Sequence, residues 1–332
     1  MNDTPPPRRD ELSVTDASMH PRGHGCYSRL LAACKRLPPA RMAVVHPCSA
    51  ESLDATIEAS YERLIVPVLV GPEQRIRALA SEHSIDLAGI EIVGTEYSHA
   101  SADAAVALAR SGHVTALMKG SLHTDELLHA VLAKDSGLRT ERRLSHVFVM
   151  DISTYPRPLM ITDAVVNIYP KLAEKRDIVQ NAINLAHRIG IREPRVAILS
   201  AVETVNPEMV STIDAAALCK MAERGQITGG KLDGPLAFDN AIDARAAQIK
   251  GIVSEVAGRA DILVVPDVEA GNMLVKQLTF LADADSAGIV LGARVPIVLT
   301  SRADSVRNRL ASVALGVLLT QPQVPNELAT PS

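Results

Sequence analysis

Short aliphatic runs alternate along the chain with longer segments in which apolar residues recur every three or four positions. Runs such as 41–47 and 114–120 have the length and composition of strands buried on both faces. Segments such as 49–65 and 99–112 have the period of a helix with one apolar face. Further candidate strands lie at 66–71, 90–94, 146–151, 159–166, 195–202, 261–267 and 289–300, and further candidate helices at 124–133, 170–190 and 207–225. The alternation predicts an α/β fold with mostly parallel sheets flanked by helices.

The overall length of 332 residues predicts two domains, and the 47 % hydrophobic content is sufficient for packed cores. Residues 1–25 are polar and rich in proline, with no apolar signal core, and we expect them to form a flexible tail. No apolar run has the length of a membrane span, so we expect no membrane partner.

Composition and charge exclude several classes of partner. The net charge is -4 and aromatic residues make up 2 %, which argues against nucleic acid and against aromatic stacking platforms. The four cysteines form no Cys-x-x-Cys pair and have no histidine spacing suited to zinc. We therefore expect no metal and no disulfide framework, and a reducing cytoplasm as the location.

Ligands of parallel sheets bind where strands end and helices begin. Four polar junctions follow aliphatic runs, at 118–126, 160–167, 264–272 and 299–305. The first supplies Lys119, Gly120, Ser121, His123 and Thr124, which can surround a ligand or form an ordinary helix cap. A lone histidine such as His123 is weak support for a general base.

The next two junctions contain candidates of the same kind. Asp163 interrupts an apolar run and needs a hydrogen-bonding partner if it is buried. Asn272 follows the turn signals of "PDVEAGN" and can hold a substrate or simply belong to the turn.

The fourth junction, "LTSRADS", has two interpretations. Ser301 and Asp304 have the spacing of a capping box, in which each side chain accepts a free helix amide. Alternatively, the helix amides bind an anion, and the Arg302 guanidinium adds a planar fork suited to phosphate oxygens. The chain contains no phosphate-binding Gly-x-x-x-x-Gly-Lys-Ser/Thr loop, no Gly-x-Ser-x-Gly elbow and no His-Glu-x-x-His motif.

Seven segments in this order resemble the phosphate acetyltransferase and phosphate butyryltransferase family. They are "LMKGSLHTDELLHAVL", "GLRTERRLSHVFVMD", "ITDAVVNIYP", "SAVETVNPEM", "DGPLAFDNAI", "PDVEAGNMLVKQL" and "VPIVLTSRADS". The similarity covers roughly residues 40 to 320. "KGSLHTDELL" and "TSRADSVRNRLAS" look most similar to the butyryltransferase branch and to the transacetylase module of enoyl-CoA hydratase fusions.

The resemblance implies a reversible exchange of acyl-CoA plus phosphate for acyl phosphate plus CoA. It implies direct transfer in a ternary complex, with coenzyme A as a substrate and with no cofactor or metal. It further implies a homodimer whose subunits have two α/β domains of the isocitrate/isopropylmalate dehydrogenase-like type, with the active-site cleft between them. The first domain then comprises 26–158 and 297–332, and the second 159–296.

The resemblance places Ser301 and Arg302 in the active site, where they would stabilise a tetrahedral oxyanion beside the phosphate. The polar group around Lys119, Ser121 and Thr124 would bind the phosphate. The acetyltransferase branch has an aspartate seven residues after the serine, proposed as the base for the CoA thiol, but this chain has Asn308. Asp304 is the favoured replacement, with His123, another acid or a locally stabilised thiolate as alternatives. The family's phosphate-site arginine could correspond to His129, Arg139, Arg142 or Arg143.

The prediction is a cytoplasmic phosphate acetyltransferase, with propionyl or butyryl specificity as an alternative. A two-domain NAD-dependent dehydrogenase is a second hypothesis, although the chain lacks a convincing dinucleotide fingerprint. A third is a non-catalytic acyl-CoA-binding protein, suggested by Asn308.

Overall fold

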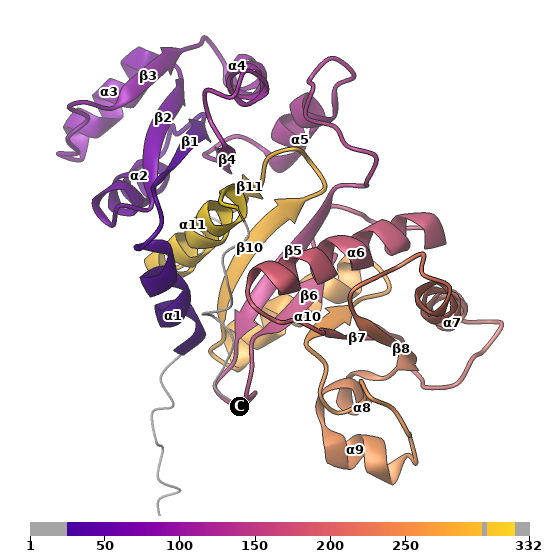
Figure 1. The fold of residues 1–332 in the computed structure, drawn as a ribbon. Helices are drawn as coiled ribbons and strands as arrows, with labels where there is room; N and C mark the ends of the chain where they lie inside the picture. Colours follow the sequence, from indigo (N-terminus) through magenta and orange to yellow (C-terminus); the bar gives the residue numbers. More distant parts are fainter. Residues whose placement is uncertain (1–24, 301–303, 323–332) are drawn as a thin grey trace, which may run out of the picture.

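The computed structural model describes residues 25–300 and 304–322, and its strands form one sheet of eleven. The order across the sheet is β3-β2-β1-β4-β11-β10-β5-β6-β9-β7-β8 (Figure 1). The predicted α/β class, with a mostly parallel sheet flanked by helices, is confirmed.

Two groups of parallel strands make up the two ends of the sheet. The first contains β3 (Glu91–Gly94), β2 (Ile65–Gly71), β1 (Ala40–Val45), β4 (Ala116–Lys119) and β11 (Ile297–Val298). The second contains β6 (Leu159–Thr162), β9 (Ile262–Val264), β7 (Arg195–Leu199) and β8 (Lys231–Leu236). Antiparallel pairing through β10 (Asp285–Leu291) and β5 (Ser145–Asp151) joins the groups.

Helices cover both faces because successive strand residues point to opposite sides. On β1, Met42 and Val44 face one core, whereas Ala43 and Val45 face another. The first core is covered by α1 (Gly25–Cys34), α2 (Ala50–Tyr61), α3 (Glu73–Glu82), α6 (Leu172–Arg188), α7 (Val210–Glu223) and α11 (Val306–Thr320). On the opposite face, α4 (Ser98–Arg110) and α5 (Thr124–Leu132) cover the first group, and α8 (Phe238–Ile242), α9 (Ala244–Ile249) and α10 (Val268–Leu281) cover the second.

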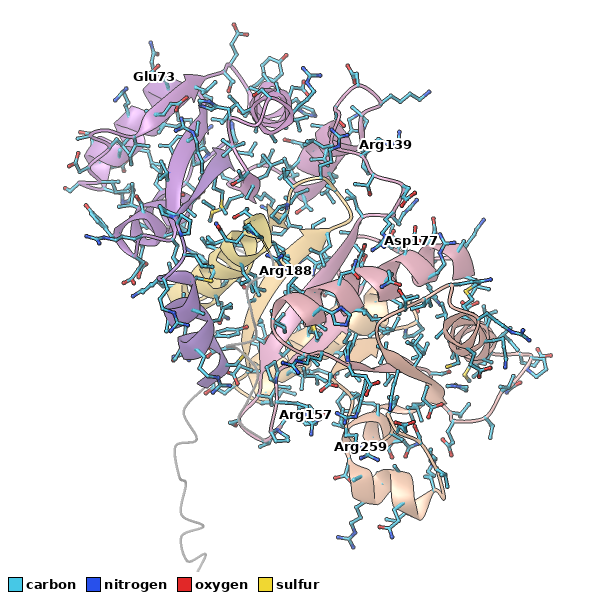
Figure 2. The ribbon with its side chains drawn as sticks, viewed as in Figure 1. Glu73, Arg139, Arg157, Asp177, Arg188 and Arg259 are labelled. Carbon is cyan, nitrogen blue, oxygen red and sulfur yellow. The ribbon has the colours of Figure 1, made fainter. Side chains whose placement is uncertain are left out.

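Contacts on the first face tie the two strand groups together. Arg188, the last residue of α6, donates hydrogen bonds to the carbonyl oxygens of Leu318 and Gln321 at the end of α11 (Figure 2). A cation at this position also suits the negative end of the α11 dipole. The C-terminal end of α11 is thereby fixed to the end of α6.

Several elements differ from the sequence prediction, and three of the differences have a local physical reason. The predicted strand 159–166 ends at Thr162, because the Asp163 carboxylate accepts the amides of the following turn. The run 289–300 is divided into β10 and β11 by a turn at Gly292, whose φ of 95° favours glycine. β8 was missed, because Gly234 and Pro235 in its middle indicate a turn.

The predicted domain boundaries coincide with connections between strands. Position 158 directly precedes β6, and position 297 begins β11. The division into two domains stays a prediction, since β5 and β10 hydrogen-bond the two groups into a single sheet. Of the predicted tail, Gly25 is the first residue of α1, and residues 1–24 lie outside the described part of the chain.

Candidate active site

A cavity of about 760 Å³ lies on the face of the sheet that carries α4, α5 and α10. Its lining comes from the β4–α5 junction and the segment that leads from β11 into α11, both next to the first strand group, and from α10, next to the second. The central strand β5 and the start of β10 complete it. We call this space the cleft cavity. Its volume falls in the range typical of small-molecule sites, about 300 to 1,000 Å³.

Four predicted site residues line the cleft cavity although they are far apart in the sequence. They are Lys119, Thr124, Asn272 and Asp304. Lys119 is the last residue of β4, and Thr124 the first of α5, so the carboxyl end of a parallel strand delivers both. Asn272 projects from α10, where its Nδ2 atom donates to the carbonyl oxygen of Ala164 at 3.5 Å. The structure thus brings three separate polar junctions together.

The turn between β4 and α5 is held tightly against the end of β1. A Cβ atom on Gly120 would lie 2.5 Å from the Val45 carbonyl oxygen and 2.7 Å from that of His46, so this close approach requires glycine. The Ser121 hydroxyl donates to the His46 oxygen at 2.8 Å and accepts from the Cys48 amide at 2.9 Å. Gly120 and Ser121 position this turn and do not line the cavity.

The Lys119 ammonium is held beside the same turn. Its Nζ atom donates to the carbonyl oxygens of Gly120 at 3.2 Å and Leu122 at 3.1 Å. His123 occupies the N-cap position of α5, but its side chain makes no capping hydrogen bond and is exposed outside the cavity lining. Lys119 therefore presents a fixed positive charge at the cavity, whereas His123 does not face it.

Asp163 is buried in a turn and surrounded by donors. Its carboxylate accepts from the amides of Val165 at 2.9 Å, Val166 at 3.0 Å and Asn167 at 3.1 Å, and from Asn167 Nδ2 at 2.6 Å. Burial raises the pKa of Asp163, and these hydrogen bonds oppose that rise. Asp163 does not line the cavity, whereas Val165 does. The hydrogen bonds of Asp163 therefore stabilise the turn that positions Val165.

The junction after β11 begins its helix later than the capping-box interpretation requires. Ser301 and Arg302 lie outside the described residues. Asp304 and Ser305 are not helical, and α11 begins at Val306 with Ser305 as its N-cap, whose hydroxyl accepts from the Asn308 amide at 3.1 Å. A cap of this helix by Ser301 is therefore wrong. Thr300 and Asp304, the latter itself a predicted catalytic residue, are the described residues on either side of this stretch, and both line the cleft cavity.

Asn308 lines the same cavity but is committed to the fold. Its side chain is buried, and Oδ1 accepts from the Ser286 amide of β10 at 3.3 Å. Nδ2 lies 3.5 Å from the Ser286 hydroxyl. The Asn308 amide thus accepts from the Ser286 backbone and donates to the Ser286 hydroxyl. A carboxylate at this position could accept but could not donate.

The sequence interpretation missed two residues of β5 that form part of the cavity wall, His146 and Phe148. They are two positions apart and so share a face, and their ring centroids are 4.3 Å apart. His146 is 1 % exposed, and its Nδ1 atom has no hydrogen-bond partner. An unpartnered buried polar atom costs about 1–3 kcal/mol. The sequence offered one signal for His146, a polar residue at the start of the apolar run "HVFVMD". Asp163 was singled out because it interrupts an apolar run in the same way.

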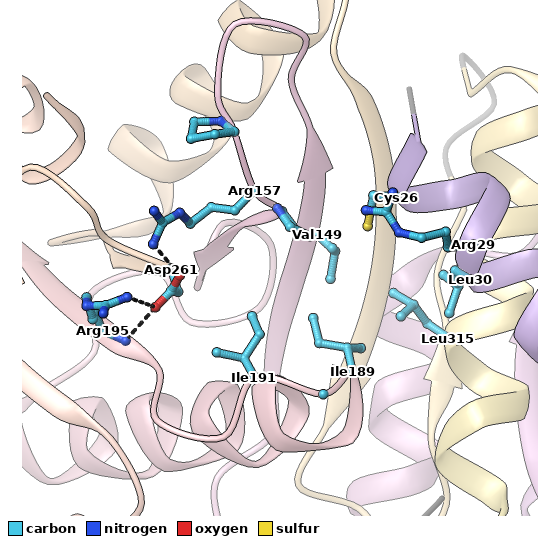
Figure 3. A pocket seen from close by; sticks show the side chains of 13 residues that line it. Cys26, Arg29, Leu30, Val149, Arg157, Ile189, Ile191, Arg195, Asp261 and Leu315 are labelled. Carbon is cyan, nitrogen blue, oxygen red and sulfur yellow. Dashed lines mark hydrogen bonds and ion pairs between the residues drawn. The ribbon is translucent and has the colours of Figure 1, made fainter. Parts of the chain in front are cut away.

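A second cavity, of about 450 Å³, lies on the opposite face, which carries α1, α6 and α11 (Figure 3). It has an apolar floor that includes Val149 and Leu315, and we call it the arginine pocket after Arg29, Arg157 and Arg195. Asp261 Oδ1 lies 3.4 Å from an Arg157 nitrogen, and its Oδ2 accepts the Arg195 amide at 2.8 Å. Burial raises the pKa of the Cys26 thiol there to about 12.

Residues 25–300 and 304–322 contain no metal-binding cluster and no membrane-spanning helix. No group of three or more His, Cys, Asp or Glu side chains in these ranges could hold a metal ion. No helix in this part of the chain has the length and apolar character needed to cross a membrane.

Comparisons with known proteins identify similar sequences and a similar solved structure. The family model described as "Phosphate acetyl/butaryl transferase" matches residues 99–317. A phosphate acetyltransferase of Rhizobium meliloti is 65 % identical over 88 % of this chain and 92 % of its own length. A phosphate butyryltransferase of Clostridium beijerinckii is 41 % identical over 88 % and 97 %. The crystal structure of a branched-chain phosphotransacylase from Enterococcus faecalis aligns with a TM-score of 0.74 and 29 % identity, covering 84 % of this chain and 99 % of that one.

Proposed function

Because the chain belongs to the phosphate acetyl- and butyryltransferase family, we propose that it transfers an acyl group reversibly between the sulfur of coenzyme A and an oxygen of inorganic phosphate. Acetyl is the proposed acyl group, since a 65 % identical relative is named for it. Propionyl and butyryl are the alternatives, because a butyryltransferase is also similar.

The convergence of Lys119, Thr124, Asn272 and Asp304 on one cavity is the observation that carries this proposal. In the direct transfer that we propose, a phosphate oxygen attacks the thioester carbonyl carbon and the C–S electron pair leaves with the CoA sulfur. The Lys119 ammonium compensates phosphate charge, and Thr124 offers a hydroxyl beside it. Two substrates held side by side in one cavity can react without a covalent enzyme intermediate.

Ser301 and Arg302 are the proposed donors to the oxyanion and the phosphate. Their neighbours Thr300 and Asp304 line the cavity, which supports a position beside it. In the thiol-forming direction the sulfur gains a proton, and in reverse a base removes it. We propose Asp304 for this role, because it lies at the cavity whereas the Asn308 amide is neutral and bonded to Ser286.

The test is formation of acyl-CoA from CoA and acetyl, propionyl or butyryl phosphate, followed by thioester absorbance. Arg302→Ala is expected to lower kcat by about 10²-fold or more, as loss of an oxyanion donor does in other enzymes. Ser301→Ala and Asp304→Asn are expected to lower kcat less. Arg245→Ala, at an exposed arginine of α9, is the matched control.

Each outcome has a definite meaning. Collapse of turnover in Arg302→Ala, with an intact fold and normal turnover in Arg245→Ala, supports the proposal. A wild-type protein that binds CoA but forms no thioester with any of the three acyl phosphates is instead a non-catalytic acyl-CoA-binding protein. Saturable binding of NADH or NADPH with no CoA binding would favour the dehydrogenase alternative.

We further propose that transfer needs neither metal nor cofactor, so exhaustive dialysis against a chelator should leave kcat unchanged. The two strand groups are proposed to act as domains around the cleft cavity, in the manner of the isocitrate/isopropylmalate dehydrogenase-like architecture. A cytoplasmic location is supported by the four free cysteines. A homodimer is supported by exposed apolar side chains at Val205, Val210 and Ile213, and light scattering of the purified protein tests it.

A further inference from the structure

His146 forms part of the floor of the cleft cavity at the middle of the sheet. It lies on β5, and its side chain is on the same face as Phe148. Phe148 packs with the core under α10, whereas Leu144, two residues before His146, belongs to the core under α4 and α5. The imidazole therefore lies where the two helix layers separate and the cavity opens.

The ring of His146 has no hydrogen-bond partner in the part of the protein that the structure describes. The hydroxyl of Thr162 donates to the backbone oxygen of His146 at 2.8 Å and leaves the ring unused. Nδ1 is fully buried and unpartnered. Nε2 makes no hydrogen bond either. It lies next to Gly288, and a Cβ atom on that glycine would be only 2.8 Å from it. Glycine at position 288 therefore leaves the space that the ring occupies.

The position of the ring relates it to the reaction site. A Cβ atom placed on Gly288 would lie 3.3 Å from the Leu299 carbonyl oxygen as well as 2.8 Å from His146 Nε2. Both atoms therefore lie beside Gly288. Leu299 directly precedes Thr300 and the junction that contains the proposed Ser301 and Arg302. His146 Nε2 is thus close to the segment where the acyl carbon is expected.

The protonation of the ring follows from its surroundings. Burial lowers the pKa of His146 to about 3, so the imidazole is neutral at neutral pH and has one N–H donor. Leaving a buried N–H unpaired is more costly than leaving an acceptor unpaired. The proton therefore belongs on Nε2, because Nδ1 is the nitrogen that is completely enclosed.

A neutral donor with apolar neighbours suits a carbonyl oxygen better than a phosphate. Phe148, Val165, Val275 and Leu299 also line the cavity, and the proposed function assigns the phosphate to the Lys119 ammonium. Resting on the proposed function, we propose that His146 contacts the acyl group and donates a hydrogen bond from Nε2–H to the acyl carbonyl oxygen.

The hydrogen bond strengthens during transfer while the proton stays on His146. When the phosphate oxygen bonds to the acyl carbon, the carbonyl π electrons move to the acyl oxygen, which becomes an oxyanion. When the C–S bond breaks, that electron pair returns and the thiolate leaves. A donor placed where negative charge develops accelerates the step.

Three variants at position 146 separate a donor from a packing role. His146→Leu removes the donor, His146→Gln places an amide N–H near the position of Nε2, and His146→Asn places one near Nδ1. We expect kcat to fall by about 10²-fold in His146→Leu and His146→Asn, with the KM for CoA changed by less than about threefold, and His146→Gln to recover at least about tenfold of that loss. His83→Leu, at an exposed histidine after α3, is the matched control.

A second measurement needs no variant. The infrared carbonyl stretch of acetyl-CoA labelled with ¹³C at the carbonyl should move to lower frequency when the thioester binds the wild-type protein without phosphate. The shift should be kept in His146→Gln and lost in His146→Asn.

Equal kcat in the wild type, His146→Leu and His146→Gln, or an unshifted carbonyl band in the bound wild type, overturns the assignment. If His146→Leu fails to fold, the Gln and Asn pair and the wild-type spectrum decide it. A wild-type protein that forms no thioester overturns the transferase function itself, which the variants at position 146 do not test.

Discussion

The two faces of strand β5 carry two cavities with opposite character. Phe148 points into the cleft cavity, and its neighbour Val149 lines the arginine pocket. In the arginine pocket, the buried Asp261 carboxylate is bonded to the Arg195 amide and paired with Arg157 and Arg195. In the cleft cavity, the equally buried His146 makes no hydrogen bond at either ring nitrogen, and its Nε2 is the nitrogen assigned to substrate.

This difference shows why the charge of a cavity does not by itself identify an active site. The arginine pocket collects three arginines, yet two of them are paired with a carboxylate that fixes the starts of β7 and β9. The cleft cavity lies beyond the carboxyl ends of β4 and β11, where loops deliver side chains to a ligand. Polar groups that the fold satisfies stabilise it, and those that it leaves unsatisfied are available to substrate.

Of the changes that compare the two cavities, the one at Lys119 has the largest expected effect. Lys119→Met keeps the aliphatic stem and removes the charge that faces the cavity, so kcat/KM for phosphate should fall by about 10²-fold, equivalent to about 2.7 kcal/mol. Steady-state kinetics with phosphate and acetyl-CoA measures it. Lys134→Met, at an exposed lysine after α5, should behave as the wild type. An unchanged kcat/KM in Lys119→Met would remove the proposed phosphate ligand and weaken the contrast between the cavities.

The corresponding change in the arginine pocket should affect stability instead of turnover. Asp261→Ala leaves Arg157 and Arg195 without their carboxylate and the Arg195 amide without its acceptor. We expect the free energy of unfolding to fall by about 2 kcal/mol, below the value for fully buried pairs because both arginines are partly exposed. Urea denaturation measures the loss, and Asp261→Asn, which keeps an acceptor, should lose less.

Activity per folded molecule gives the decisive comparison for Asp261→Ala. We expect its kcat to stay within about twofold of the wild type, since the variant acts on the far face of the sheet. A tenfold loss of kcat in fully folded protein would show that the arginine pocket is coupled to the reaction.

The effect of pH on stability tests the environment of His146. The pKa of His146 is about 3 in the folded protein against 6.5 ordinarily, so the unfolded chain binds a proton that the folded chain excludes. The stability associated with this residue is therefore fully present above pH 6.5 and is lost as pH falls toward 3. His146→Leu should abolish this loss, which amounts to about 1.4 kcal/mol one pH unit below the ordinary pKa.

Urea denaturation of the wild type and His146→Leu between pH 7 and 5 checks this expectation. The variant's deficit should shrink with falling pH. Parallel curves would mean that the folded-state pKa of His146 is not depressed.

The alternating pattern was sufficient to predict the fold class and the polar junctions. The strand at 114–120 and the helix at 124–133 are close to β4 and α5, and the polar residues between them lie where parallel strands deliver ligands. The pattern could not place Asp163 or Ser121, because both types of residue also close turns and only long-range contacts decide between the two roles.

His146 was missed for a related reason. A single histidine at the edge of an apolar run is usual in a strand. Its importance depends on its position beside Gly288 of β10 and the Leu299 segment, which are far away in sequence. Likewise, the spacing of Ser301 and Asp304 predicts a cap, but Ser305 caps α11. Spacing gives the possible caps of a helix, and packing determines which residue starts it.

The smallest expected effect compares Ser121 with Thr124, which belong to the same turn. Ser121→Ala deprives the buried Cys48 amide of its acceptor and the His46 oxygen of a donor, and should lower the free energy of unfolding by about 1 kcal/mol. Thr124→Val removes a hydroxyl that lines the cleft cavity and should mainly raise the KM for phosphate. Phosphate saturation curves and urea denaturation of both variants give the comparison. If Ser121→Ala raises the KM more than Thr124→Val does, the Ser121 hydroxyl leaves its partners to bind substrate, and a group that the fold satisfies also acts in the reaction.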